Sequence, residues 1–204
     1  MHRKIILVLV AVFVTANLAQ AQFSLGARAG FNLTNMSMKF DGEKADPKPD
    51  FKPGFQVGVV GEYAFGSLAL QPAILFATQG YKMGEGDYKV TTNLNYLQVP
   101  INVQYKYGLG GVSLLGQAGP YLGYAFSGKA KMGDESSDIE FGSEDNEMKA
   151  FDFGVGLGLG VEFLSKMQAT VGYNIGLANL ANADKVTTKN NGLAITFTYM
   201  FLKK

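Results

Sequence analysis

The segment from Phe151 to Phe163 constrains the fold more than any other part of the chain, because it alternates strictly between two kinds of residue. Large apolar side chains occupy every odd position, and glycine or an acid occupies every even position. A period of two predicts a β-strand with one bulky apolar face and one small or polar face. The segment is longer than an ordinary strand of about five or six residues. It suits a tilted strand that crosses a bilayer, which needs roughly 9–11 residues.

The same alternation recurs along the chain and predicts eight strands in all. We expect them at residues 23–34, 54–65, 68–81, 93–107, 112–126, 151–163, 167–177 and 192–202. The connections alternate between tight turns, at 66–67, 108–111 and 164–166, and long polar loops, at 35–53, 82–92, 127–150 and 178–191. Short turns at one end and long loops at the other are typical of outer-membrane barrels. The sequence therefore predicts an all-β fold, an eight-stranded antiparallel up-and-down transmembrane β-barrel.

The composition of the polar face indicates which side of the barrel meets lipid. A soluble barrel would carry many lysines and glutamates on that face, but here it is mostly Gly, Ala, Gln, Asn, Thr and Ser. Small and amide side chains suit the narrow interior of an eight-stranded barrel. Aromatic residues gather on the apolar face toward both ends of the strands, as in the two aromatic girdles of such proteins. We expect the bulky face to contact lipid.

The first residues have the organisation of a secretory signal. A basic start, Met1 to Lys4, precedes an apolar run from Ile5 to Ala16, and Ala19-Gln20-Ala21 is a small-x-small cleavage site. The apolar run is shorter than the ~20 residues that a membrane-spanning helix needs. We expect residues 1–21 to be a signal peptide and residues 22–204 to form the barrel domain. Export would deliver the chain to the periplasmic insertion machinery and then to the cell outer membrane.

Three prolines do not fit a regular barrel. Pro72, Pro100 and Pro120 lie inside three consecutive predicted strands. Proline lacks the N–H that the ladder of hydrogen bonds requires, and within sheets it is normally found at edges or bulges. A closed barrel has no edge, so we expect β-bulges or bends at these positions.

The segments around these prolines carry a family resemblance. Leu70–Phe76 with Gly80, Tyr96–Tyr107 and Gly119–Tyr124 together resemble the PorT-like outer-membrane β-barrel family of Bacteroidetes-type bacteria. The resemblance covers essentially the whole chain after the signal, and it implies the barrel fold and, for the founding member, a link to protein secretion and gliding. Gln71 and Ala73 flank Pro72 where relatives often have an acidic residue, so the resemblance supports the fold more than an inherited role for lumen charge.

Five charged residues lie in the register of the lumen: Arg28, Glu62, Lys106, Asp152 and Glu162. They suit either an ion path or a plug whose charges neutralise one another. We favour the plug, because unpaired buried charge is costly and a barrel of eight strands leaves little continuous space for water. In this interpretation Arg28 pairs with Glu62, Glu162 or both.

Two long loops suggest ligands, each with a simpler alternative. The third loop contains Asp134, Glu135, Asp138, Glu140, Glu144, Asp145 and Glu147. Carboxylates can bind calcium, but the spacing of an EF-hand is absent, and a solvated acidic loop is the favoured interpretation. Lys39, Lys44 and Lys52 in the first loop could contact lipopolysaccharide phosphates. Their mixture with acidic residues favours a plain solvated loop.

Catalysis is not expected. The only histidine, His2, lies in the signal, so the barrel cannot hold a Ser-His arrangement. A mechanism that uses only Asp and Glu is the remaining enzymatic alternative. The chain has no cysteine, which excludes disulfides and thiolate metal sites. A net charge of +1 gives no argument for nucleic acid, and no motif indicates a cofactor.

These observations leave three hypotheses for function. The first, which we favour, is a structural or interaction barrel of the outer membrane, whose surface loops serve adhesion, envelope integrity or docking of an envelope protein. The second is a small-solute channel or an accessory of a secretion machine. The third is a soluble periplasmic lipid-binding barrel. Outer-membrane lipid, including lipopolysaccharide, is the expected surrounding partner under the first two hypotheses.

Overall fold

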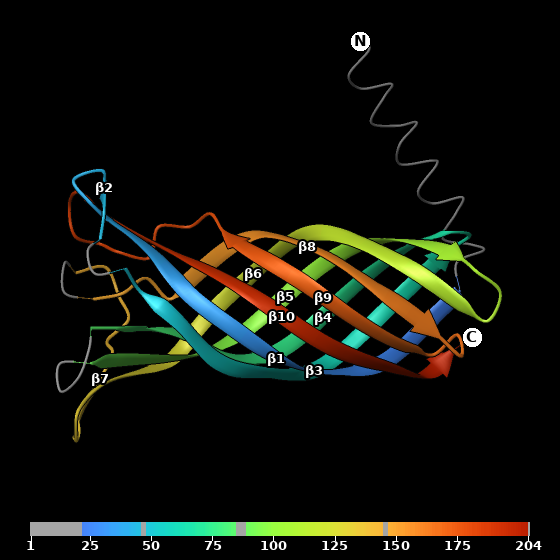
Figure 1. Cartoon of the computed structure of the whole chain (residues 1–204), viewed down its shortest axis with the longest axis horizontal. Coiled ribbons are helices and arrows are strands. Elements are labelled where there is room, and N and C mark those ends of the chain that lie inside the picture. Colours follow the sequence, from blue (N-terminus) through green and yellow to red (C-terminus); the bar gives the residue numbers. More distant parts are fainter. Residues whose placement is uncertain (1–21, 46–47, 85–88, 145–146, 204) are drawn as a thin grey trace, which may run out of the picture.

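The computed structural model describes residues 22–45, 48–84, 89–144 and 147–203, and within them eight long antiparallel strands form a barrel (Figure 1). The long strands are β1 (Gln22–Phe40), β3 (Asp50–Phe65), β4 (Leu68–Met83), β5 (Val90–Gly108), β6 (Val112–Met132), β8 (Phe151–Phe163), β9 (Met167–Gly176) and β10 (Val186–Lys203). Two short strands, β2 (Glu43–Lys44) and β7 (Glu135–Asp138), extend β1 and β6 as hairpins.

Hydrogen bonding closes the sheet. Each long strand pairs antiparallel with the next one along the chain, and β10 returns to pair with β1 from Ser24–Lys203 to Phe40–Val186. The closing pair is among the longest in the barrel, so the first and last strands are joined as firmly as any neighbours. The predicted eight-stranded, up-and-down barrel is confirmed.

The strands are longer than expected at the end that carries the long loops. β8 has the expected bounds, but β10 starts at Val186 rather than residue 192, and β1 continues to Phe40 rather than ending at residue 34. Residues 35–40 pair in register with 186–191. Beyond the membrane band the outer face of a strand meets water and needs no large apolar side chains, so the alternation is lost while the backbone ladder continues. The sequence of this extension therefore has the composition of a loop.

The two faces of the wall are oriented as the alternation predicts. Leu157 of β8 is 56% exposed and Leu159 is 72% exposed on the outer surface. Gly158 faces the lumen, where an added Cβ would lie 3.1 Å from Gln117 Nε2 and from the Val171 carbonyl oxygen. Large apolar side chains are exposed on every long strand, whereas the fully buried positions include many glutamines, asparagines and threonines. Polar inside and apolar outside is the arrangement of a barrel that is surrounded by lipid.

The prolines interrupt the ladder without the bulges that we expected. Pro72 pairs with Ile101, Pro100 with Tyr121 and Pro120 with Val155, each on one side only, and register is unchanged across all three. Each proline has no paired residue on its other neighbouring strand, where the pairing continues beyond the gap in the same register. Register shifts occur elsewhere, at Leu25/Gly26, Phe51/Gln56 and Asn95/Tyr96. We expected bulges or bends at Pro72, Pro100 and Pro120. Bulges are absent there, because a missing N–H removes a bond but adds no residue to the strand, and the bend stays a prediction.

The two ends of the barrel differ in their connections. The tight turns and the last strand's end lie at one end, and β2 and β7 lie at the other (Figure 1). We call these the short-turn end and the loop end. At the loop end, Met148 forms bridges with Phe141 of the same loop and with Ala181 of the connection between β9 and β10. Asn182 of that connection donates to the Gly142 carbonyl oxygen. In the described residues, no helix has the length and apolarity to span a membrane.

A lumen sealed at both ends as the candidate functional site

A layer of polar side chains crosses the lumen near the short-turn end. Every long strand supplies at least one member of this charged layer: Arg28, Glu62, Gln71, Gln104, Lys106, Gln117, Glu162, Gln168 and Thr198. These residues point inward because they share the register of the small residues. Most of them are buried, and Gln71, Gln104, Gln168 and Thr198 have no exposed surface.

Lys106 is the centre of charge in this layer. Its Nζ lies 2.7 Å from Glu62 Oε1 and 2.6 Å from Glu162 Oε2. The amide Nε2 of Gln168 donates to Glu62 Oε2 and to Glu162 Oε2, both at 2.9 Å. One ammonium and one amide therefore hold two carboxylates that would otherwise repel each other.

Arg28 joins the layer through neutral side chains. Its Nε donates to Thr198 Oγ1 at 2.9 Å, and its Nη2 donates to Gln71 Oε1. Gln71 Nε2 in turn donates to Glu62 Oε2 at 3.0 Å. We expected Arg28 to pair with Glu62, Glu162 or both. Its link to Glu62 runs instead through Gln71, and the register explains this difference. Ser24 lies opposite Glu62, whereas Arg28 lies opposite Gly58, four residues farther along the strand.

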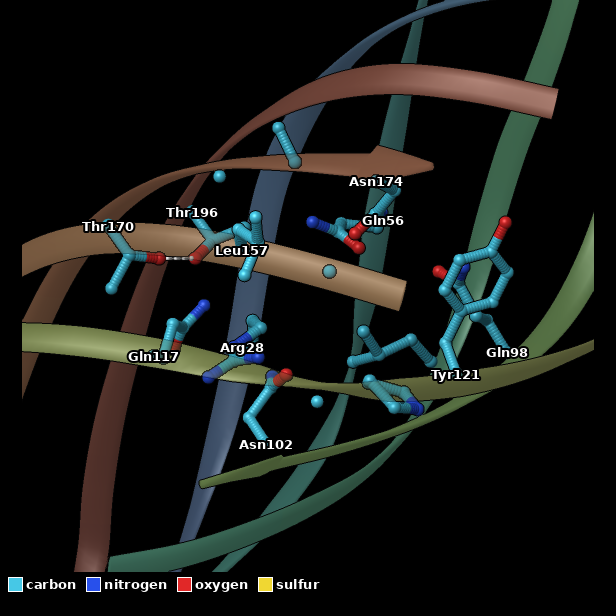
Figure 2. Close-up of a pocket in the computed structure, with 16 residues that line it drawn as sticks. Arg28, Gln56, Gln98, Asn102, Gln117, Tyr121, Leu157, Thr170, Asn174 and Thr196 are labelled. Atoms are coloured by element: carbon cyan, nitrogen blue, oxygen red, sulfur yellow. Dashed lines mark hydrogen bonds between the residues drawn. The ribbon is translucent and has the colours of Figure 1, made fainter. Parts of the chain in front are cut away.

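Two small cavities lie in the lumen between this layer and the loop end, among the residues that the structure describes. A cavity of about 50 Å³ is lined by Arg28, Gln56, Gln98, Asn102, Tyr121 and Asn174, among others (Figure 2). A second, of about 10 Å³, shares Gln56, Gln98, Tyr121 and Asn174 with it. A single water needs about 10–15 Å³ of such space. The two cavities can therefore hold a few waters, and amides and hydroxyls are available to bond them.

Asp152 lies apart from the other four predicted lumen charges. It is buried toward the loop end, where Asn190 Nδ2 donates to Asp152 Oδ2 at 2.9 Å and to Tyr96 Oη at 3.1 Å. Tyr121 Oη is 3.5 Å from the same carboxylate oxygen. Within the residues that the structure describes, no lysine or arginine forms an ion pair with Asp152. Its surroundings are aromatic hydroxyls and an amide.

Apolar residues close the loop end. We call this cluster the apolar cap; its buried members are Met36, Ala77, Leu94, Tyr96, Ala125, Ala178 and Leu180. Leu180 comes from the connection between β9 and β10 and has no exposed surface. Its backbone is fixed on both sides, since Leu180 N donates to Thr188 O at 2.8 Å and Lys149 N donates to Leu180 O at 2.9 Å. Sequence reasoning did not find the cap, because its loop residues lie outside the alternating segments.

Residues 18–182 of the chain match the family model of the outer membrane protein beta-barrel domain. The chain belongs to this family. The match covers most of the barrel and stops before β10, which the structure shows completing the closed sheet. Membership places the protein in the outer membrane, where short turns face the periplasm and long loops face outward.

Solved structures with the same architecture are distant in sequence. OprG from Pseudomonas aeruginosa is 16% identical, with a TM-score of 0.54, over 89% of this chain and 96% of OprG. Neisserial surface protein A is 15% identical, with a TM-score of 0.49, over 88% of this chain and 97% of that protein. No curated protein matches the chain. The likeness to OprG shows the barrel fold alone. The family match and the exposed apolar wall argue against the soluble barrel considered above.

The structure revises the interpretation of the first loop of this outer-membrane barrel. Lys39 and Lys44 are exposed cross-strand neighbours in the hairpin of β1 and β2. Lys52, however, is only 7% exposed and lies in β3, with Nζ 3.3 Å from the Pro53 carbonyl oxygen. It faces the barrel interior and is not placed to touch lipopolysaccharide.

The acidic third loop is partly ordered by its own contacts. Asp138 pairs with Lys129 across the hairpin of β6 and β7 at 3.7 Å, and Glu147 Oε2 accepts from Glu144 N at 2.9 Å. Asp145 lies outside the described residues. Among the residues described, no group of three or more His, Cys, Asp or Glu side chains is arranged to hold a metal ion.

Proposed function

We propose that this protein is a non-conducting outer-membrane barrel that presents a folded surface at its loop end to partners in the envelope or outside the cell. The observation that carries the proposal is the double seal of the lumen. The charged layer crosses the barrel near the short-turn end, and the apolar cap closes the loop end. Between them the cavities measure about 50 and 10 Å³.

The lumen residues then have a structural role. Lys106 and Arg28 together balance the charges of Glu62 and Glu162: Lys106 pairs with both glutamates, and Arg28 is linked to Glu62 through Gln71. Asp152 lies apart, beside Asn190 and Tyr121. The two glutamates are held by Lys106 and Gln168 rather than facing a cleft. This arrangement supports a filled barrel and offers a substrate no access to the carboxylates, so we propose no catalysis.

The folded loop end supports the interaction role. β2 and β7 extend the barrel wall, and the loop segments between β7 and β8 and between β9 and β10 are joined by backbone and side-chain hydrogen bonds. A surface that is already ordered loses little conformational entropy when it binds. The resemblance to the PorT-like family supports an envelope protein as one such partner, and crosslinking in intact cells followed by purification of the barrel would identify it.

Conductance across a planar lipid bilayer tests the seal. The reconstituted protein is expected to show no sustained ionic current. The double variant Gln104→Ala and Leu180→Ala shortens one buried side chain at each seal and is expected to give intermittent current. Stable open-pore steps from the unaltered protein would refute the proposal and favour the channel hypothesis.

The sequence supports removal of the signal. The predicted cleavage site, Ala19-Gln20-Ala21, directly precedes Gln22. We propose that the mature protein starts at Gln22, with residues 1–21 removed on export. The mass of the intact protein purified from outer membranes tests this directly.

A further inference from the structure

A pocket of about 480 Å³ opens on the outer rim of the barrel at the loop end. We call it the rim pocket; the residues that matter here are Tyr124, Phe141, Ser143, Lys149, Phe151 and Phe153. Tyr124 of β6 and Phe151 of β8 are cross-strand partners at the point where the two strands leave the membrane band. Phe141 and Ser143 approach from the loop that precedes β8.

The start of β8 and the residue two positions before it give the pocket an apolar and a polar part. Lys149, Phe151 and Phe153 occupy alternate positions, and all three line the pocket. Phe151 and Phe153 are half exposed on the lipid-facing surface, with ring centroids 6.4 Å apart. Lys149 is exposed one step farther from the membrane. A cation therefore stands at the level of the head groups, directly beyond a pair of aromatic rings.

Among the residues that the structure describes, no ion pair involves Lys149, and no acidic side chain lines the rim pocket. Asp41 and Asp184 line a neighbouring pocket together with Lys149, but Asp41 pairs with Lys185. Glu147 is turned to the backbone N–H of Glu144, and Asp152 faces the lumen. Lys149 and the exposed hydroxyl of Ser143 are thus available as donors to an anionic group.

The loop side of the pocket is fixed in advance. Asn182 Nδ2 donates to the carbonyl oxygens of Gly142 and Glu147 at 3.0 and 3.1 Å, and Gly142 N donates to Met148 O at 3.1 Å. Phe141 also packs against the apolar cap. A ligand that enters the rim pocket therefore meets a surface that is already formed.

We propose that the rim pocket binds a membrane lipid with an anionic phosphate head group. The phosphate contacts Lys149 and Ser143, and the first part of an acyl chain lies along Phe151 and Phe153. Charge complementarity selects an anionic over a zwitterionic head group, and the position at the membrane surface selects a lipid over a free anion. This site does not depend on the seal in the lumen. A negative result for lipid binding would therefore leave the proposed function unaffected, and a conducting barrel would leave the lipid site unaffected.

Fluorescence quenching by brominated lipids tests the proposal. The chain has no tryptophan, so Phe151→Trp introduces a single reporter into the pocket. The variant is folded into phosphatidylcholine vesicles that contain either brominated phosphatidylcholine or brominated phosphatidic acid. Phosphatidic acid is expected to bind at the reporter about fivefold more strongly, the factor for one lysine at a membrane surface.

The matched variants are Lys149→Gln and Lys44→Gln, each combined with Phe151→Trp. Both remove one positive charge from the loop end, but Lys44 lies in β2, away from the pocket. Only Lys149→Gln is expected to abolish the preference. Equal quenching by the two lipids before any lysine is changed would overturn the proposal, as would equal losses in the two variants. Displacement of phosphatidic acid by inorganic phosphate at constant ionic strength would also overturn it, in favour of a free-anion site.

Discussion

The two ends of the lumen are closed by different kinds of side chain. At the short-turn end, charges and amides from seven long strands and the hydroxyl of Thr198 from β10 meet in one hydrogen-bonded layer. At the loop end, a connection between strands folds back and packs Leu180 against Met36, Leu94 and Tyr96. Tight turns such as 66–67 are too short to reach into the lumen, so strand side chains must cross it there. The long connection between β9 and β10 removes that requirement.

The difference predicts different responses to mutation. A layer of mutually neutralising charges is sensitive to the loss of one member, because its partners remain buried. An apolar cluster loses stability in proportion to the volume removed and recovers part of it by relaxation. Four substitutions test this contrast, and the free energy of unfolding in lipid vesicles, measured by urea titration, is the common readout.

The largest effect is expected for Lys106→Ala at the short-turn end. The substitution leaves Glu62 and Glu162 close together without their shared cation. The free energy of unfolding should fall by roughly 3–5 kcal/mol, the cost of removing one partner of a buried ion pair. Lys166→Ala, which removes an exposed lysine at the same end, is the control and should leave stability unchanged.

Neutralising both glutamates separates charge from packing in this layer. The triple variant Lys106→Ala, Glu62→Gln and Glu162→Gln should regain much of the stability that Lys106→Ala loses. If it is as unstable as Lys106→Ala alone, the role of Lys106 is to fill space, and the contrast between the two ends disappears.

A smaller loss is expected for Leu180→Ala at the loop end. Leu180 is fully buried in the apolar cap, so truncation removes packed methyl groups and leaves a cavity. We expect a loss of about 2–3 kcal/mol, near the low end for buried leucine, because a loop relaxes more easily than a strand. Leu164→Ala in an exposed turn is the control. A loss of stability as large as that of Lys106→Ala would show that the apolar cap does not relax around the cavity, and the contrast between the two ends would fail.

The sequence predicted the barrel wall well and its filling less well. Alternation in 151–163 fixed the bounds of β8 and the inward or outward direction of each side chain, because a period of two has only two phases. It also predicted that Arg28, Glu62, Lys106, Asp152 and Glu162 share the register of the lumen. Which of them touch depends on the stagger between strands, and this stagger placed Gln71 between Arg28 and Glu62. The apolar cap depends on how a loop folds, for which the sequence has no periodic signal.

Glu62→Gln is expected to cost about 2 kcal/mol. Glu62 accepts hydrogen bonds from Lys106, Gln71 and Gln168, and a bond to a charged group contributes about 1.5–3 kcal/mol. The substitution keeps the shape but presents an NH₂ group to at least one of these donors. Glu140→Gln, in an exposed part of the third loop, should have no measurable effect. A neutral result at position 62 would mean that the layer depends on shape rather than charge.

The smallest effect, and the only favourable one, is expected for Asp152→Asn at the loop end. This is the same kind of change as Glu62→Gln, from a buried carboxylate to its amide, but Asp152 has no ion-pair partner among the described residues. An asparagine oxygen can still accept from Asn190 and Tyr121, which now donate to Asp152 Oδ2. The substitution removes the desolvation cost of a lone charge and should stabilise the barrel by about 1 kcal/mol. If Asp152→Asn instead destabilises the barrel as much as Glu62→Gln does, then a cation compensates Asp152 in the membrane, and both ends of the lumen are held by charge.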